Sequence, residues 1–372
     1  MRKKTIAVVA VFLAAMMLFC GCSPKASTTQ DEAAKDLNSL TMDELVELAK
    51  KDGHIESVGM PDDWANWGDS WKAISEKYGI THFDVDMSSA EEIAIMKSEG
   101  ENGTKDIGDV GQMFTSQLVA DGVTQGYKVS TWDTIPDWAK DPDGKWYISY
   151  TGTMTFIVNK TLTNGYVPTS WKELLDSDLV VSVGNVVGGA SSQAGVLGAA
   201  IAFGGGFDNV QPGIDFFKEL AAQNRLYLGD VGADQIANGD VQVGIQFYDF
   251  TSLNYRDIVN ASDAGYEIEV VVPTDGAITS GYALTFNKYS PNPYATALAM
   301  EYLLSDEGQN DRAMGYARPI RIDSIQLSEE AQSKTLPGEM YANAIPVTDP
   351  AQLTAACAEI SRLWEEELVP LF

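Results

Sequence analysis

The chain has 372 residues and carries 53 acidic against 25 basic side chains, a formal net charge of −28 at pH 7. Such an acidic surface repels nucleic acid and anionic lipid, which excludes proteins that bind either one through their general charge. The length is ample for a hydrophobic core, and it favours two lobes over one.

The N-terminus predicts export. Three basic residues precede an uncharged apolar run of 14 residues, 6–19, which is too short for a comfortable membrane span, so we interpret residues 1–21 as a secretory signal peptide. The Gly-Cys-Ser sequence that ends the run resembles a bacterial lipoprotein cleavage site, which makes Cys22 the expected lipidated N-terminus. Residues 22–42, with their Ser, Thr and Ala, predict a flexible tether. After cleavage only Cys22 and Cys357 would remain, so no disulfide is expected.

Past the tether, short apolar runs alternate with helical periodicities, as in "HIESVGM", "WANWGDSWKAISEKYG", "THFDVDM" and "SAEEIAIMKSEG". This βα alternation predicts an α/β fold with largely parallel sheets flanked by helices.

The stretch "PDDWANWGDSW" at 61–71 places three tryptophans directly after a predicted strand. Their spacing of three and four residues is typical of a buried helical face, and we assign Trp71 to the core. Pro-Asp-Asp marks a predicted helix start. Residues between the end of a strand and the start of the next helix often face a cleft. Asp63, Trp64 and Trp67 are therefore candidate ligand contacts, with helix capping and core packing as the alternatives.

Two apolar, small-residue-rich segments, 147–160 and 279–288, each end in Asn-Lys and are separated by about 120 residues that contain complete βα units. An insertion of this size between two paired crossings predicts a second lobe. We expect lobe 1 to comprise 43–152 and 280–372, lobe 2 to comprise 153–279, and two strands to form the hinge.

The loop "VVGGASSQAG" leads from a predicted strand into a helix that begins near Ser192. Its glycines let the backbone approach a ligand, and Ser191, Ser192 and the free N–H groups of the helix start would favour an anion. The alternative is that one serine simply caps the helix.

Five further residues complete the candidate ligand site. Tyr248 and Asp249 follow the strand in "GIQFYDFTS", where Asp249 could bind hydroxyl groups or an ammonium group, or cap a helix that starts at Thr251 or Ser252. Asp109 follows another predicted strand, and Thr153 and Ser280 lie in the two crossings.

A family resemblance rests on "VPTSWKELLD" (167–176), "NPYATALAMEYLLSDEGQ" (292–309) and "GYARPIR" (315–321). With the lipoprotein signal and the double crossing, these segments resemble the solute-binding lipoproteins of bacterial ABC importers, in the type II cluster that serves ferric iron, polyamines, thiamine and phosphate esters. The resemblance implies a two-lobe type II periplasmic-binding-protein fold, anchored outside the cytoplasmic membrane. It also implies a monomer that delivers one small solute to a permease and its ATPase. Arg318 and Arg321 of the last segment could neutralise an anion.

The ligand class is less specified. Ferric members generally use neighbouring tyrosines, and this chain has no Tyr-Tyr pair; with only two histidines, no metal site or cofactor is expected. Polyamine members commonly carry an acidic pair and a Trp before the second crossing, where this chain has "PTDGAITSGYA". Because the Gly-Gly-Ala-Ser-Ser turn favours negative charge, we expect an organic anion such as a phosphate ester, with a polyamine or ferric iron as the alternatives.

Enzyme motifs are missing from the sequence: there is no GxSxG, HExxH, P-loop or GxGxxG. Paired carboxylates leave a secreted hydrolase as a remote alternative. We therefore expect a binding protein and not an enzyme.

Overall fold

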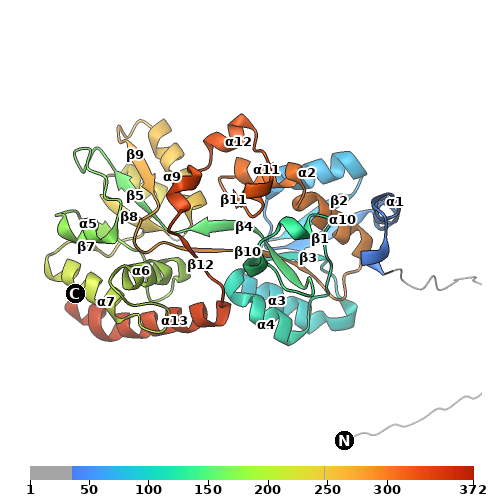
Figure 1. Cartoon of the computed structure of the whole chain (residues 1–372), viewed down its shortest axis with the longest axis horizontal. Helices are drawn as coiled ribbons and strands as arrows, with labels where there is room; N and C mark the ends of the chain where they lie inside the picture. The colour runs from blue at the N-terminus through green and yellow to red at the C-terminus, as the bar shows by residue number, and fades with distance from the viewer. Residues whose placement is uncertain (1–35, 247) are drawn as a thin grey trace, which may run out of the picture. The chain divides into compact units, whose positions relative to one another are not determined.

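The structure is a computed structural model that describes residues 36–246 and 248–372, of which Leu37–Phe372 form one compact unit (Figure 1). The predicted signal peptide, Cys22 and most of the predicted tether lie outside the described residues. No described helix is long and apolar enough to cross a membrane.

The first sheet has the strand order β11-β4-β10-β3-β1-β2, and β12 pairs with β10. Its strands are β1 (His54–Val58), β2 (Thr81–Val85), β3 (Ile107–Gly111), β4 (Trp146–Thr153), β10 (Ile278–Phe286), β11 (Arg318–Pro319) and β12 (Ile345–Pro346). β1 runs parallel to β2 and β3, whereas β10 runs antiparallel to β3 and β4, so the sheet is mixed.

The second sheet has the order β7-β6-β8-β5-β9. Its strands are β5 (Thr155–Asn159), β6 (Val181–Ser182), β7 (Leu226–Tyr227), β8 (Val243–Gln246) and β9 (Ile268–Val271). β6 is parallel to both neighbours, and β5 is antiparallel to both of its own. The predicted two-lobe α/β fold is thus confirmed, with antiparallel pairing wherever the chain crosses between lobes.

Helices flank both sheets. Those of lobe 1 are α1 (Met42–Asp52), α2 (Trp67–Tyr78), α3 (Ser89–Glu99), α4 (Thr115–Asp121), α10 (Pro293–Leu303), α11 (Asp306–Met314) and α12 (Glu329–Ser333). Those of lobe 2 are α5 (Trp171–Asp176), α6 (Ala190–Ala202), α7 (Gln211–Ala222), α8 (Ala233–Ala237), α9 (Asp249–Ala261) and α13 (Pro350–Leu363). The short 3-10 helices are η1 (Leu37–Ser39), η2 (Gly100–Asn102), η3 (Gln112–Phe114), η4 (Trp132–Thr134), η5 (Asp137–Ala139), η6 (Ile322–Ser324), η7 (Gly338–Tyr341) and η9 (Val369–Leu371), and one π-helical turn spans Trp364–Leu368.

Local sequence explains where several helices begin. At α1 the Thr41 side chain accepts from the Glu44 N–H while Glu44 reaches back to the Thr41 N–H, a capping box that satisfies two free helix donors. Ser88 and Glu91 form the same arrangement at α3. Both helix starts follow from Ser/Thr-x-x-Glu patterns in the sequence.

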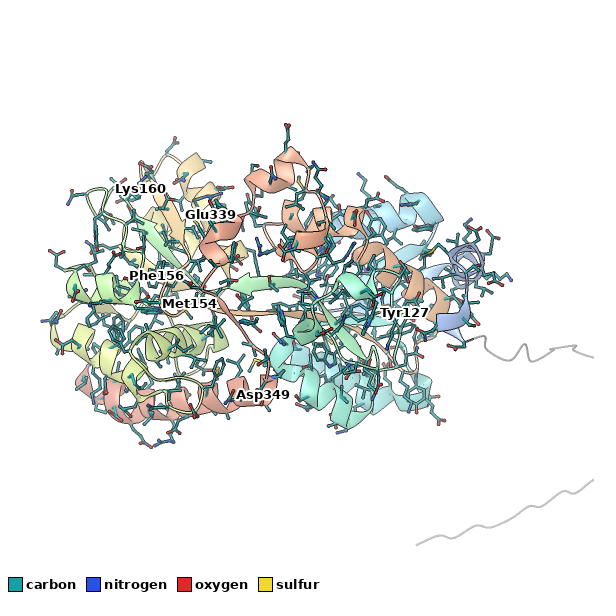
Figure 2. All side chains as sticks on the ribbon, in the orientation of Figure 1. Tyr127, Met154, Phe156, Lys160, Glu339 and Asp349 are labelled. Atoms are coloured by element: carbon teal, nitrogen blue, oxygen red, sulfur yellow. The ribbon has the colours of Figure 1, made fainter. Side chains whose placement is uncertain are left out.

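Each lobe has its own hydrophobic core. Trp67 and Trp71 belong to the core of lobe 1, and Trp171 belongs to the core of lobe 2, where it packs edge-on against Phe156. The chain passes between the lobes where β4 ends at Thr153 and β5 begins two residues later. Figure 2 shows Phe156 in the second lobe and Tyr127 in the first.

The C-terminal helix corrects one predicted boundary. Residues 350–372 were expected on lobe 1, but α13 buries Leu353, Ala356, Cys357 and Ile360 in the core of lobe 2. Figure 1 shows α13 (red) lying along α6 and α7. The helix has an apolar stripe that needs a partner, and the largely apolar α6 supplies it, so packing decides a placement that sequence order did not.

Candidate functional site

A cavity of about 490 Å³ opens at the carboxyl ends of β1, β2 and β3, which is where open α/β sheets bind ligands. We call it the acidic cavity. It is lined by Gly59, Pro61, Asp63, Trp64, Asp86, Met87, Ser88, Ser89, Ala90, Glu92, Asp109, Phe114 and Tyr282. Four of these residues are acidic, and none of the described lining residues is Lys, Arg or His.

The turn that follows β1 aims Trp64 at this cavity. Gly59 has φ +68°, and Ala65 and Asn66 also adopt left-handed backbone conformations, with φ 46° and 58°. Because these residues interrupt helical geometry, α2 begins at Trp67 and not at the Pro-Asp-Asp sequence that was expected to start it. The two tryptophans therefore face different surroundings. Trp64 is half-buried and lines the cavity, whereas Trp67 is fully buried.

Trp67 is therefore wrong as a direct ligand contact, and it supports the site from behind. Its indole Nε1 donates to Asp109 Oδ2 at 3.3 Å, and its ring carries the Arg312 guanidinium at 3.6 Å. Arg312 is itself buried and donates to the Asn66 carbonyl and to Ser70 Oγ. This positive charge lies beneath the cavity floor and partly offsets the charge of Asp109.

Asp109 forms the floor of the acidic cavity. Its Oδ2 accepts the Tyr150 hydroxyl at 2.6 Å, and that hydroxyl accepts the Trp64 Nε1–H at 2.7 Å. Its Oδ1 is buried and has no hydrogen-bond partner among the described residues. Burial raises the pKa of Asp109 to about 7. A buried acceptor without a donor costs about 1–3 kcal/mol, so this oxygen is suited to a donor that arrives with a ligand.

Glu92 is the second acid of the floor, and sequence reasoning missed it. Its carboxylate is buried, accepts the Asp109 N–H at 3.1 Å, and has its pKa raised first by burial and then by the charge of Asp109. A Cβ at Gly59 would lie 2.3 Å from Glu92 Oε1, and one at Gly108 would lie 2.5 Å from Oε2, so both glycines make room for this carboxylate. A signal was present: Glu92 is four residues before the apolar Met96 on a predicted helix, which places an acid on the buried face.

Aromatic rings enclose the floor from both lobes. Trp64 meets Phe250 and Tyr282 edge-on, with ring centroids 5.2 and 5.6 Å apart, and Tyr282 stacks on Tyr150 at 5.5 Å. Phe250 in turn stacks on Tyr248 at 5.0 Å. Phe250, from the first turn of α9, thus brings lobe 2 against the wall of the acidic cavity.

A second cavity of about 300 Å³, the interlobe cavity, shares Asp63 and Trp64 with the first. Its other lining residues are Asp62, Ala65, Asn66, Phe250, Thr251, Asn254, Tyr255, Met314, Gly315 and Tyr316, which come from lobe 1 and from α9 of lobe 2. Trp64 therefore lines two compartments of one cleft.

Asp249 is buried and serves the hinge. It accepts the Thr153 N–H at 3.1 Å and the Tyr341 hydroxyl at 2.5 Å, and burial raises its pKa to about 6. α9 starts at Asp249 itself, earlier than the expected start at Thr251 or Ser252. Thr153 is also buried, and neither residue is among those that line the acidic cavity.

The remaining candidates lie outside the acidic cavity. Ser280 donates to Gln112 Oε1 at 3.0 Å and, with Tyr248, lines a space of only about 20 Å³, too small for a solute. Ser191 and Ser192 lie half-buried in the first turn of α6 and line neither the acidic nor the interlobe cavity. Of the residues proposed from the sequence, Asp63, Trp64 and Asp109 line the acidic cavity. Asp86, Phe114 and Tyr282 line it too and were not proposed from the sequence.

One hydroxyl lies near a histidine and a carboxylate, but the arrangement is not that of a nucleophile. Ser57 donates to Asp84 Oδ1 at 2.5 Å and lies 2.8 Å from His82 Nε2. Since the Ser57 hydrogen is directed at Asp84, His82 does not act as its base. Ser57 is also fully buried. Among the described residues, no group of three or more His, Cys, Asp or Glu side chains could hold a metal ion.

Solved structures share this fold. A solute-binding protein structure from Bordetella parapertussis matches with a TM-score of 0.70 at 17% identity, covering 86% of this chain and 99% of that one. The periplasmic binding protein AfuA from Actinobacillus pleuropneumoniae, with fructose-6-phosphate bound, gives 0.62 at 18% identity over 85% and 98%. The apo ferric ion-binding protein A of Pasteurella haemolytica gives 0.66 at 15% identity over 84% and 97%.

No curated protein sequence matches the chain significantly. A family model described as bacterial extracellular solute-binding protein matches residues 102–342. The match includes Asp109, the hinge strands and lobe 2 apart from its C-terminal segment 350–372. Together with the two-lobe fold and the cleft at the strand ends, this match identifies the chain as a member of the bacterial extracellular solute-binding protein family, the extracytoplasmic solute-binding components of ABC transporters.

Proposed function

We propose that this protein captures a small organic cation that carries at least one ammonium group and delivers it to an ABC permease. The observation that carries the proposal is the floor of the acidic cavity. Asp109 Oδ1 has no donor among the described residues, and Glu92 lies beside it. An ammonium group supplies both hydrogen-bond donors and the positive charge that two buried carboxylates need.

The walls support the same ligand class. Trp64, Phe114 and Tyr282 surround the acidic floor, and a cation over an aromatic face gains about 0.5–2 kcal/mol, most when water is excluded. Asp63 and Asp86 add negative charge at the rim. From the sequence alone we expected an organic anion, and we now propose a cation instead. Acidic and aromatic side chains line the cavity, whereas the serines of the α6 turn lie outside it.

An organic anion is the rival ligand. It is supported by the α6 turn, whose helix start favours negative charge, and by the fold shared with AfuA, whose structure holds fructose-6-phosphate. For this chain an anion would have to enter a cleft whose acidic cavity has no basic lining residue among those described. For ferric iron, the ion named for the Pasteurella protein, the described residues offer no group of three or more His, Cys, Asp or Glu side chains, and the sequence has no Tyr-Tyr pair.

Capture follows from the placement of the cleft between lobes. The lobes meet at β4, β5 and β10, and closure about these strands would bury the ligand between the acidic cavity and α9. Cys22 would hold the protein at the membrane through a lipid, close to the permease.

A thermal-shift screen followed by calorimetric titration tests the ligand class. The panel is putrescine, spermidine, choline and thiamine against glucose 6-phosphate and ferric citrate. We expect an amine to bind, Asp109→Asn and Glu92→Gln to weaken it by about tenfold or more, and the exposed Glu330→Gln to leave it unchanged. Binding of glucose 6-phosphate that is lost in a Ser191→Ala/Ser192→Ala double variant, with no amine binding, would establish the rival.

A further inference from the structure

A cavity of about 410 Å³ lies on the opposite face of the hinge from the acidic cavity. Along β4, Tyr150 packs with Tyr282 and Trp64 on the cleft side, so by the alternation of strand side chains Thr151 and Thr153 point the other way. Thr151 and Thr153 do line this second space, which we call the rear cavity. It is therefore separated from the proposed solute site by the hinge strands themselves.

Arg318 is the charged group of the rear cavity. It pairs with Thr151 across β11 and β4, which places both side chains on the same face, and its guanidinium lies over the Tyr341 ring at 4.2 Å. Among the described residues it forms no ion pair with a carboxylate. The chain has a net charge of −28, so acidic partners are abundant, yet this guanidinium lies in a cavity without one. This arrangement indicates a binding site for an anion.

Two acids lie nearby and do not neutralise this arginine. Asp249 is behind Tyr341, whose hydroxyl it accepts at 2.5 Å, and the charge of Arg318 acts on its pKa only as a minor lowering influence. Asp323 lines the cavity, but its side chain is exposed to solvent. Apart from its contact with Tyr341, the guanidinium of Arg318 therefore remains available to an acceptor in the cavity.

The other walls define the shape of such an acceptor. The Thr153 and Thr279 hydroxyls lie 2.8 Å apart, so whichever one donates, the hydrogen of the other is left for a ligand oxygen. Trp138, Ile320 and Pro346 supply apolar surface. A planar guanidinium binds a carboxylate through two parallel hydrogen bonds, and the apolar walls would cover a hydrocarbon body. The volume falls in the range of about 300–1,000 Å³ that is usual for small-molecule sites.

We propose that the rear cavity is a second ligand site, for a small organic carboxylate with an apolar or aromatic body, held by Arg318. The site does not depend on the identity of the solute in the cleft. Its walls come from β4 and β11 of lobe 1 and from η7, where Tyr341 packs against the Leu253 cluster of lobe 2, so the carboxylate bridges parts of both lobes.

Calorimetric titration of the purified protein with benzoate, benzamide and inorganic phosphate tests the site. Benzoate is expected to bind at one site per chain, with benzamide and phosphate at least about tenfold weaker because each lacks one of the two recognised features. Arg318→Gln is expected to weaken benzoate by about tenfold or more. Arg362→Gln is the matched control, since Arg362 is exposed on α13 and paired with Glu359 and Glu366.

A second variant separates loss of binding from loss of fold. Ala342 is an exposed lining residue, so Ala342→Trp fills the cavity without touching Arg318, and it should abolish benzoate binding while the unfolding temperature is retained. No benzoate binding at millimolar concentration, or benzoate binding that survives both Arg318→Gln and Ala342→Trp, would overturn the proposal. Phosphate that binds as tightly as benzoate would overturn the assignment of an organic carboxylate.

Discussion

The Trp64 indole donates to the Tyr150 hydroxyl at 2.7 Å, and this one contact ties the wall of the acidic cavity to its floor. The same hydroxyl donates to Asp109 Oδ2, so both of its roles are used and its orientation is fixed. A residue on the turn after β1 and a residue on the hinge strand β4 thereby hold a common carboxylate. The Trp64 ring and the vacant side of Asp109 are set in place before a ligand arrives.

Removing the Tyr150 hydroxyl should loosen this arrangement. In Tyr150→Phe the Trp64 N–H loses its acceptor and Asp109 Oδ2 loses one of two donors, so we expect a loss of about 1–3 kcal/mol in the free energy of unfolding. Affinity for the amine should fall about tenfold, because Trp64 is no longer oriented. Urea denaturation and calorimetry measure the two effects. Tyr166→Phe, at an exposed tyrosine, is the control, and equal stability of the two variants would contradict the role of Tyr150.

The two tryptophans of the turn should separate into a binding and a structural residue. Trp67 is fully buried, so Trp67→Ala should cost about 3–5 kcal/mol of stability. Trp64 lines both cleft cavities, so Trp64→Ala should weaken amine binding with a smaller loss of stability. Denaturation and titration of both variants decide this. A Trp64→Ala protein with normal amine affinity would remove Trp64 from the site.

The acidic floor should make stability fall as pH rises. Burial raises the pKa of Asp109 from an ordinary 3.8 to about 7, so between about pH 4 and 7 the folded protein keeps a proton that the unfolded chain has lost. Each unit of this shift corresponds to about 1.4 kcal/mol. Asp109→Asn should therefore gain stability relative to wild type as the pH rises from about 4 to 7, with no further gain above that range. Comparing the two proteins isolates Asp109 from other groups such as His82, whose pKa burial lowers to about 4. A difference that does not change with pH would contradict the raised pKa.

Amine binding should have the opposite pH dependence. An ammonium group favours the ionised carboxylate, so below about pH 7 binding must release a proton from Asp109, and affinity should rise from pH 5 to 8. Calorimetry in buffers with different ionisation enthalpies counts the released protons. Asp109→Asn should release fewer, and equal proton release from both proteins would exclude Asp109 as the linked group.

Membrane attachment should depend on Cys22. In a native-like bacterial host, Cys22→Ala is expected to move the protein from the membrane fraction to the soluble extracytoplasmic fraction, because the lipid acceptor is gone. Cys357→Ala is the matched control, since that cysteine is buried in lobe 2. Equal membrane retention of wild type and Cys22→Ala would show that the anchor lies elsewhere.

Local patterns predicted the fold well. Ser88-x-x-Glu91 marks a helix start through contacts within four residues. The two crossings mark the hinge because each has a recognisable apolar sequence of its own, although they pair across a long insertion. The position of α13 was not predictable in this way. Its apolar stripe fits either lobe, and only the packing with α6 selects lobe 2.

The site was predictable only in part for the same reason. Trp64 follows β1 and Asp109 lies near the carboxyl end of β3, and such strand ends meet in a cleft, so their positions follow from topology. Glu92 comes from the buried face of the first turn of α3, and Tyr282 comes from a hinge strand, and at both places the sequence predicts core. Left-handed backbone at Ala65 and Asn66 separates Trp64 from Trp67, and no helical spacing rule anticipates it.

The most direct test of the organic-cation proposal is a crystal structure of the protein with the amine that binds most tightly in the screen. We predict an ammonium nitrogen within about 2.7–3.2 Å of Asp109 Oδ1, with Trp64 against the ligand and Glu92 beside it. A ligand seated on the Ser191–Ser192 turn of α6, with the acidic cavity filled only by water, would contradict it.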